Sequence, residues 1–190
     1  MMIDLYCLGG AAVDLILDAP RLPLDGEKLF VHHADQLGGG FIANTACAAA
    51  KLGLRTAWGG FVGSDAFGQT VMRDFDLFNV ETSDVVFLDD SSTDFTVVIL
   101  PPSGERTILI VPNLPTPPPL THSIKQSLKK ARFGYTVFFD HDWFIEIAQL
   151  LHSEGGKVVV DMEVNTLKDI NAAKAMLRHT DIVFSSEEGL

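Results

Sequence analysis

The chain has 190 residues, enough for one domain with a substantial core and a small appendage. Its net charge of −11 and sequence pI of about 4.8 argue against the basic surface that nucleic acid requires, so no nucleic-acid partner is expected. Although 47% of the residues are hydrophobic, no apolar run approaches the roughly 18 residues that a membrane helix needs. No membrane partner is therefore expected.

The cysteines and the amino-terminal segment indicate in which cellular compartment the protein is expected. Cys7 and Cys47 both lie in apolar segments, which favours two buried thiols over a disulfide. Neither has a partner at the spacing of a zinc site. Segment 1–10 lacks a basic stretch and is predicted to be a first strand, so no signal peptide is expected. We therefore expect a cytoplasmic protein.

The first predicted element is strand 2–10, a near-continuous apolar run that ends in glycines, as is typical of buried strands. A second strand is expected at 13–20. Segment 24–37 contains a turn and then a strand of weak alternation. After a run of three glycines, helix 42–52 is predicted, and Gly53 would stop it.

The middle of the chain contains both predicted strands and a predicted helix. Strand 55–63 is followed by an amphipathic helix over 65–78, for which Asp65 is the expected cap. Segments 92–100 and 106–112 flank the turn sequence Pro-Pro-Ser-Gly-Glu, which predicts a β-hairpin.

From residue 134 onward strands and helices alternate, which predicts a parallel sheet covered by helices. The predicted elements of the second half are helix 121–131, strand 135–140, helix 142–156, strand 157–162, helix 166–179 and strand 180–185. Segments of about 27–36 and 92–112 do not fit this alternation and are expected to form a small antiparallel β lid. We predict a three-layer αβα, Rossmann-like domain over 1–190 with a mostly parallel sheet. No helix follows the last strand, so the fold is expected to be truncated on its carboxyl side.

The glycine run at 38–40 leads directly into the helix that carries Asn44. Its spacing gives neither the dinucleotide fingerprint nor a P-loop. Glycines permit positive φ and close backbone approach, a helix amino terminus favours polar or anionic groups, and Asn44 can both donate and accept hydrogen bonds. The residues alone leave two interpretations open. One is a binding site for a ligand, and the other is a tight turn with Asn44 as the helix cap.

Segment 38–68, GGGFIANTACAAAKLGLRTAWGGFVGSDAFG, resembles the first signature of the PfkB/ribokinase family of carbohydrate kinases. The shared features are a double glycine before an asparagine, a small residue after it, and glycines that close the helix and follow the next strand: Gly39, Gly40, Asn44, Ala46, Gly53 and Gly63. The resemblance extends along essentially the whole chain. It implies a ribokinase-like fold in which the hairpin 92–112 belongs to a lid over the substrate.

The resemblance also implies a substrate site for a sugar or a nucleoside. Its candidate residues are Asp14, Gly39, Gly40, Asn44, Phe95 and Asp140. Asp14 stands where the family binds sugar hydroxyls, and Phe95 on the lid is a candidate cover for a sugar face. Phe41 replaces a lysine of ribokinase and Ala12 an asparagine, which favours a less polar substrate than ribose.

The resemblance further implies that the parent protein transfers the γ-phosphate of ATP, with Mg²⁺, to a substrate hydroxyl. The family's catalytic aspartate lies in a Gly-Ala-Gly-Asp motif, so the base is expected downstream of Leu190 and this chain alone is expected to be inactive. Ser186 and Gly189 replace the Asn and Glu of the family's Asn-x-x-Glu motif, which leaves Glu187 and Glu188 as candidate metal ligands. The lid is expected to offer a homodimer surface. The alternative is a non-catalytic sugar-binding or assembly module that has lost its ATP site.

Segment 140–143, Asp-His-Asp-Trp, places two carboxylates at the end of a predicted strand, where α/β sheets keep their sites. Asp142 is predicted to cap the helix that follows. A metal site there would need a third ligand. Asp161 ends another predicted strand and is a further candidate for the same edge.

Overall fold

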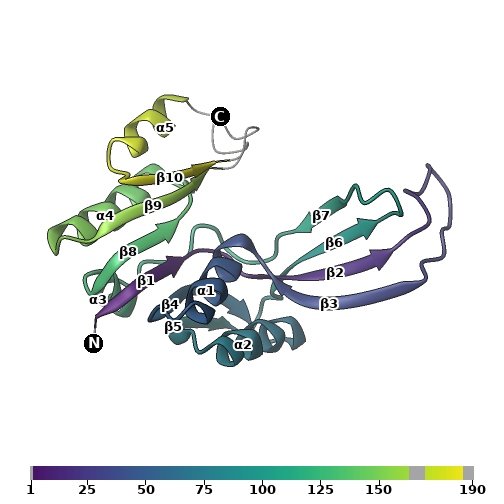
Figure 1. Ribbon diagram of the computed structural model, residues 1–190, viewed down its shortest axis with the longest axis horizontal. Coiled ribbons are helices and arrows are strands. Elements are labelled where there is room, and N and C mark those ends of the chain that lie inside the picture. Colours follow the sequence, from purple (N-terminus) through teal and green to yellow (C-terminus); the bar gives the residue numbers. More distant parts are fainter. Residues whose placement is uncertain (1, 163–169, 186–190) are drawn as a thin grey trace.

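The computed structural model describes residues 2–162 and 170–185. Within these ranges the main sheet has six strands in the order β10-β9-β8-β1-β4-β5, and every adjacent pair is parallel (Figure 1). Its strands are β1 (Ile3–Leu8), β4 (Thr56–Gly63), β5 (Glu81–Leu88), β8 (Ala131–Thr136), β9 (Lys157–Met162) and β10 (Ile182–Ser185). The parallel sheet predicted from the alternation of elements is confirmed.

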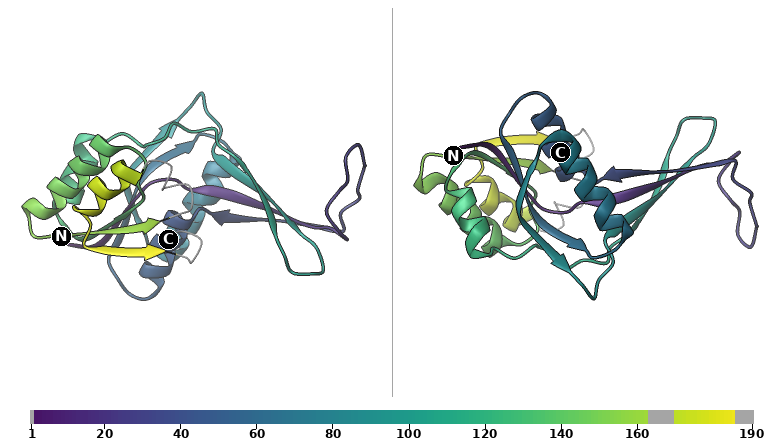
Figure 2. Two further views of the ribbon diagram at one scale, coloured as in Figure 1. Left: turned by 90° about the horizontal axis from the view of Figure 1, so that it is seen from above. Right: turned by 90° about the horizontal axis from the view of Figure 1, so that it is seen from below.

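Helices cover both faces of the main sheet (Figure 2). They are α1 (Phe41–Lys51), α2 (Ala66–Phe78), α3 (His122–Leu128), α4 (His141–Ser153) and α5 (Ile170–Leu177). Successive residues of a strand point to opposite faces. Accordingly Tyr6 of β1 packs in the apolar cluster under α3 and α4, whereas Cys7 packs in the cluster under α1 and α2. The three-layer αβα arrangement is therefore confirmed.

A second sheet, the lid sheet, extends away from the main sheet (Figures 1 and 2). Its strands within the described residues, in spatial order, are β3 (His33–Gly39), β2 (Ala12–Asp18), β6 (Asp94–Leu100) and β7 (Thr107–Val111). The predicted hairpin β6–β7 is antiparallel, as is β2–β3, but β2 and β6 pair in parallel. The lid is thus mixed rather than wholly antiparallel, because strand 12–18 joins it between the two expected segments.

Two strands of the main sheet also differ from the sequence prediction. Strand β5 was not predicted, because its first half is polar, its one fully buried residue is Asp84, and its apolar run covers only residues 85–88. Strand β8 lies at Ala131–Thr136 rather than 135–140, because it pairs with β1 in a register that joins Ala131 to Ile3. In both cases partners distant in the sequence, rather than the local pattern, select the strand.

The two cysteines are free thiols, Cys7 buried in the core and Cys47 half-buried on α1. Burial, with the Asp74 carboxylate nearby, raises the pKa of Cys47 to about 11. Among the described residues, none of the helices combines the length and apolar character needed to cross a membrane.

Candidate functional site

Asp14 lies on β2, where the lid sheet leaves the main sheet. Thr96 stands directly opposite it on β6, and the Thr96 hydroxyl donates a hydrogen bond of 2.6 Å to Asp14 Oδ1. The Asp14 side chain is only half-buried. This contact orients the carboxylate and leaves it accessible from the face of the lid sheet on which it lies.

The neighbouring strand supplies the space for this carboxylate. A Cβ atom on Gly39 would lie 2.4–2.7 Å from the carboxylate atoms of Asp14, which no real side chain tolerates. Gly40 has a φ of 89°, and a Cβ there would come within 3.1 Å of the backbone of Ala11 and Ala12. Packing within the chain itself therefore favours glycine at both positions, and Gly39 leaves room for the Asp14 carboxylate.

Asn44 does not cap helix α1, so that interpretation of the sequence is wrong. Gly40 occupies the N-cap position and makes no side-chain cap, while the Asn44 backbone N–H donates to the Gly40 carbonyl at 2.8 Å. The Asn44 side chain is exposed on the first turn of the helix. It lines a small cavity of about 90 Å³ with Gly39, Cys47 and Asp74. The amide is therefore available to a ligand beside the glycine run.

Phe95 does not share the face of Asp14. It precedes Thr96 on β6, so strand alternation directs it to the opposite face of the lid sheet. There its ring packs against Phe67 of α2, with centroids 5.5 Å apart. The structure therefore uses Phe95 to attach the lid sheet to α2 and does not bring it to Asp14.

Asp140, the remaining candidate, is the N-cap of α4. Its Oδ1 accepts the backbone N–H of Trp143 at 3.0 Å. The prediction that Asp142 caps this helix is wrong, since Asp142 lies in the first turn, fully exposed, and contacts His141 Nδ1 at 2.9 Å. The cap falls on Asp140 because the helix starts two residues earlier than its apolar pattern suggests.

The sequence analysis missed the network that anchors the lid. Asp65, correctly predicted as the cap of α2, accepts hydrogen bonds from Gly68 N–H at 2.8 Å and from Thr93 through its N–H at 3.0 Å and its hydroxyl at 2.7 Å. Burial acts to raise the pKa of Asp65, but these donors outweigh it and lower that pKa. Because Thr93 immediately precedes β6, the network fixes where the lid strand begins. The Gly-Ser-Asp-Ala-Phe-Gly segment was the sequence signal for it.

Asp161 lies on β9, where the Tyr135 hydroxyl donates to its Oδ2 at 2.8 Å. Burial raises the pKa of Tyr135, so the phenol stays protonated. Over residues 2–162 and 170–185, no group of three or more His, Cys, Asp or Glu side chains could hold a metal ion. Glu187 and Glu188 lie outside the described residues.

The sequence profile described as pfkB family carbohydrate kinase matches residues 2–190. The chain belongs to this family. Ribokinase of Arabidopsis thaliana is 32% identical to the pfkB-family chain over 109 residues, which cover 56% of this chain and 29% of the relative. Deoxyribokinase of Salmonella typhi is 30% identical over 110 residues, covering 57% and 36%.

Solved structures agree on the fold. A crystal structure described as a putative ribokinase II from E. coli superposes with a TM-score of 0.83 at 18% identity, over 98% of this chain and 63% of that one. Arabidopsis thaliana ribokinase complexed with ribose and ATP gives a TM-score of 0.77 at 20% identity, over 97% and 72%. The pfkB-family chain therefore has the ribokinase-like fold. Its matched segment spans about a third of the length of these curated relatives.

Proposed function

We propose that this chain carries the substrate-binding half of a kinase that transfers the γ-phosphate of ATP to a hydroxyl group of a sugar or nucleoside. The observation that carries the proposal is the arrangement around Asp14. Its carboxylate is held by Thr96, given room by Gly39, and left half exposed at the root of the lid sheet. Membership of the pfkB family supports the reaction type.

In this proposal Asp14 accepts hydrogen bonds from substrate hydroxyl groups, because an ionised carboxylate is an acceptor only. Asn44, exposed at the first turn of α1, provides both a donor and an acceptor to a neighbouring hydroxyl. Asp140 Oδ1 already accepts a hydrogen bond from the Trp143 N–H, so Asp140 would contact a substrate only through its other oxygen. We assign the tightest substrate contact to Asp14.

ATP would supply the transferred phosphate, as in the relative whose structure is described with ribose and ATP. We place the catalytic base and the ATP-binding residues after Leu190, and we expect the 190-residue chain alone to be inactive. Mg²⁺ would accompany the ATP phosphates, since the described residues contain no group of three or more His, Cys, Asp or Glu side chains that could hold it by themselves. The cytoplasmic location remains a prediction.

We also propose that the lid sheet pairs with a second copy. Strand β7 exposes Ile108, Leu109 and Ile110 by 45%, 52% and 73%. β3 and β7 lie at the two edges of this sheet, and uncovered edges and apolar faces favour association. Sedimentation equilibrium would test this, with Ile110→Lys expected to shift the protein to monomer.

The substrate proposal is tested by calorimetric titration of the chain with ribose, deoxyribose and a panel of nucleosides. We expect Asp14→Ala to weaken binding of the preferred compound about tenfold or more, since a hydrogen bond to a charged group contributes about 1.5–3 kcal/mol. Asn44→Ala should weaken it less.

Asp18→Ala is the matched control, because Asp18 lies four residues along the same strand and is exposed. If Asp14→Ala and Asp18→Ala bind the compound equally well, the site is assigned wrongly. Sugar binding together with an absence of phosphoryl transfer in a longer version of the protein would instead support a non-catalytic sugar-binding module.

A further inference from the structure

A second concave surface lies at the amino-terminal edge of the main sheet. It has a volume of about 640 Å³ and is lined by the residue before β1, the starts of β8 and β9, and the turn that follows α4. This volume is within the range of small-molecule sites. β1 runs from this edge toward the lid sheet (Figure 1), and Asp14 lies on β2, beyond the carboxyl end of β1. The concavity and the proposed substrate site therefore lie at opposite ends of the main sheet. We call this surface the basic concavity, after its lining.

The lining of the basic concavity is strongly cationic in an otherwise acidic chain. Four of its lining residues are Lys129, Lys130, Arg132 and Lys157, and its lining contains one carboxylate, Glu154. The whole chain has 14 Lys and Arg against 25 Asp and Glu. A local excess of positive charge against this background raises the local concentration of anions.

Most of this charge is not neutralised. Among the described residues, Lys129, Lys130 and Lys157 form no side-chain ion pair within 4.0 Å. Lys157 contributes only a distant attraction to Asp181, whose pKa is lowered chiefly by hydrogen bonds from His152 and Val158 that outweigh burial. The three ammonium groups therefore remain available to a ligand.

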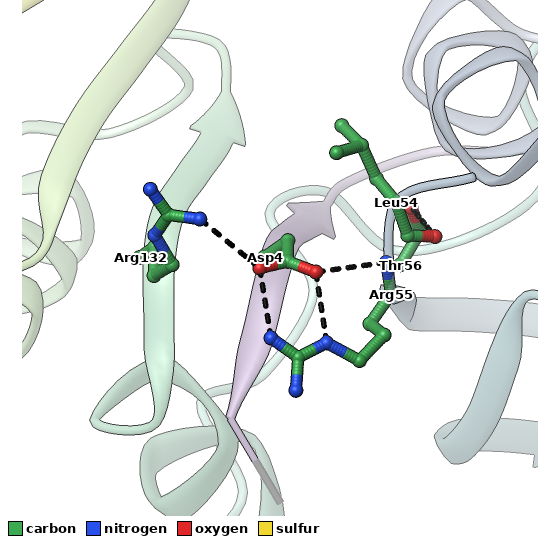
Figure 3. A network of polar contacts seen from close by, with 5 residues as sticks. All are labelled: Asp4, Leu54, Arg55, Thr56 and Arg132. Atoms are coloured by element: carbon green, nitrogen blue, oxygen red, sulfur yellow. Dashed lines mark hydrogen bonds and ion pairs between the residues drawn. The ribbon is translucent and has the colours of Figure 1, made fainter. Parts of the chain in front are cut away.

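Arg132 is held in place from one side (Figure 3). The Asp4 carboxylate accepts three hydrogen bonds from Arg55: from Nε at 2.9 Å, from Nη2 at 3.0 Å and from the backbone N–H at 3.1 Å. Arg132 donates to Asp4 only through Nη1, at 3.3 Å. These donors, Arg55 foremost, hold the pKa of Asp4 well below its usual range, so the carboxylate stays charged. Asp4 is thus occupied mainly by Arg55, and Arg132 keeps most of its donors free beside the concavity.

Helix stabilisation accounts for only part of this cluster. Lys129 and Lys130 follow α3, where cations complement the negative end of the helix dipole. Lys157 starts β9 four residues after the end of α4 and can play the same part there, whereas Arg132 lies on β8.

Gly155 and Gly156 line the same surface, and a Cβ on Gly155 would meet nothing within 4 Å. Lys157 pairs with Phe133, so strand alternation directs Arg132 to the other face of the sheet, and the two charges flank the concavity from different sides. Four cations around one concavity suit a compact polyanion.

We propose that the basic concavity binds a small molecule through its phosphate groups, at a site separate from the proposed substrate site. Lys129, Lys130 and Lys157 supply point charges, and the guanidinium of Arg132 supplies paired donors to phosphate oxygens.

The test uses inorganic pyrophosphate as the probe, titrated calorimetrically into the whole chain. The pocket variant is Lys129→Gln/Lys157→Gln. The control is Lys28→Gln/Lys174→Gln, which makes the same change in net charge at exposed positions outside the concavity. We expect the pocket variant to bind pyrophosphate about tenfold or more weakly and the control to stay within about twofold of wild type. Wild-type affinity should also fall as NaCl is raised.

A measurement on the wild type guards against a misfolded variant. On addition of pyrophosphate, the amide NMR signals of Gly155 and Gly156 should shift, while those around Asp14 stay in place. Equal weakening in both double variants would mean that only overall charge attracts the anion, and would overturn the proposal. Shifts centred on Asp14 and Asn44 would overturn it as well.

Discussion

The main sheet and the lid sheet differ in how far their apolar side chains are buried. In the main sheet, Tyr6, Cys7 and Leu8 of β1 are all at most 1% exposed, because helices cover both faces. In the lid sheet, Ile108, Leu109 and Ile110 of β7 stay exposed, and only the root of the sheet packs on α2 through contacts such as Gln36 to Thr70. The stability of this chain therefore resides in the main sheet. The lid sheet contributes the proposed ligand contacts at its root.

The comparison predicts its largest effect in the core. Phe144 of α4 is fully buried and meets Phe138 edge-to-face with centroids 4.8 Å apart. We expect Phe144→Ala to lower the free energy of unfolding by about 3–5 kcal/mol. Leu24→Ala, at a position 71% exposed between β2 and β3, should change it by less than about 0.5 kcal/mol. Urea denaturation of both variants measures the two changes in unfolding free energy. Equal losses would contradict the inference that the stability of the chain resides in the main sheet.

The next largest effect is expected at the root of the lid. Gly39→Ala would push a Cβ into the Asp14 carboxylate, and we expect a loss of about 1–3 kcal/mol in unfolding free energy together with weaker sugar binding. Gly10→Ala is the control, because a Cβ at Gly10 meets nothing within 4 Å. Thermal denaturation and calorimetry check both effects. A fully stable Gly39→Ala protein with unchanged sugar affinity would refute the role given to this glycine.

A somewhat smaller loss is expected where the two sheets are joined. Asp65→Ala removes the α2 cap and both acceptor contacts to Thr93, and should cost about 1–2 kcal/mol. Hydrogen exchange should show faster exchange in β6 than in β1, since Thr93 leads into the lid strand. Uniform acceleration throughout the chain would show that Asp65 supports the fold in general and has no special link to the lid.

The smallest effect concerns pH. The pKa of Asp65 is lower in the folded chain than its ordinary value of 3.8, so its contribution to stability is present above about pH 4 and is lost as the pH falls through the folded pKa. Asp65→Asn should therefore show a weaker dependence of stability on pH below about 4 than wild type. Denaturation midpoints between pH 2 and 6 test this, and parallel curves for the two proteins would contradict it.

Much of the candidate site could be read from the family resemblance. Segment 38–68 led to Gly39, Gly40 and Asn44, and a separate point of resemblance led to Asp14. The structure gathers Asp14 and the two glycines at one junction, with Asn44 close by. Phe95 could not be judged in this way, because its face depends on how β6 pairs with β2. The Thr96 contact to Asp14 was likewise hidden, since 82 positions separate the two residues.

By itself the sequence determined the alternation of helices and strands after residue 134, the hairpin at the lid, the Asp65 cap and the family. These features depend on hydrophobic period, turn residues and short motifs, which local sequence records. The tertiary structure alone decided the parallel pairing of β2 with β6, the inclusion of β5 around the buried Asp84, and the choice of Asp140 as helix cap. The physical reason is that strand partners and helix starts are selected by contacts between distant segments, whose energies no local pattern contains.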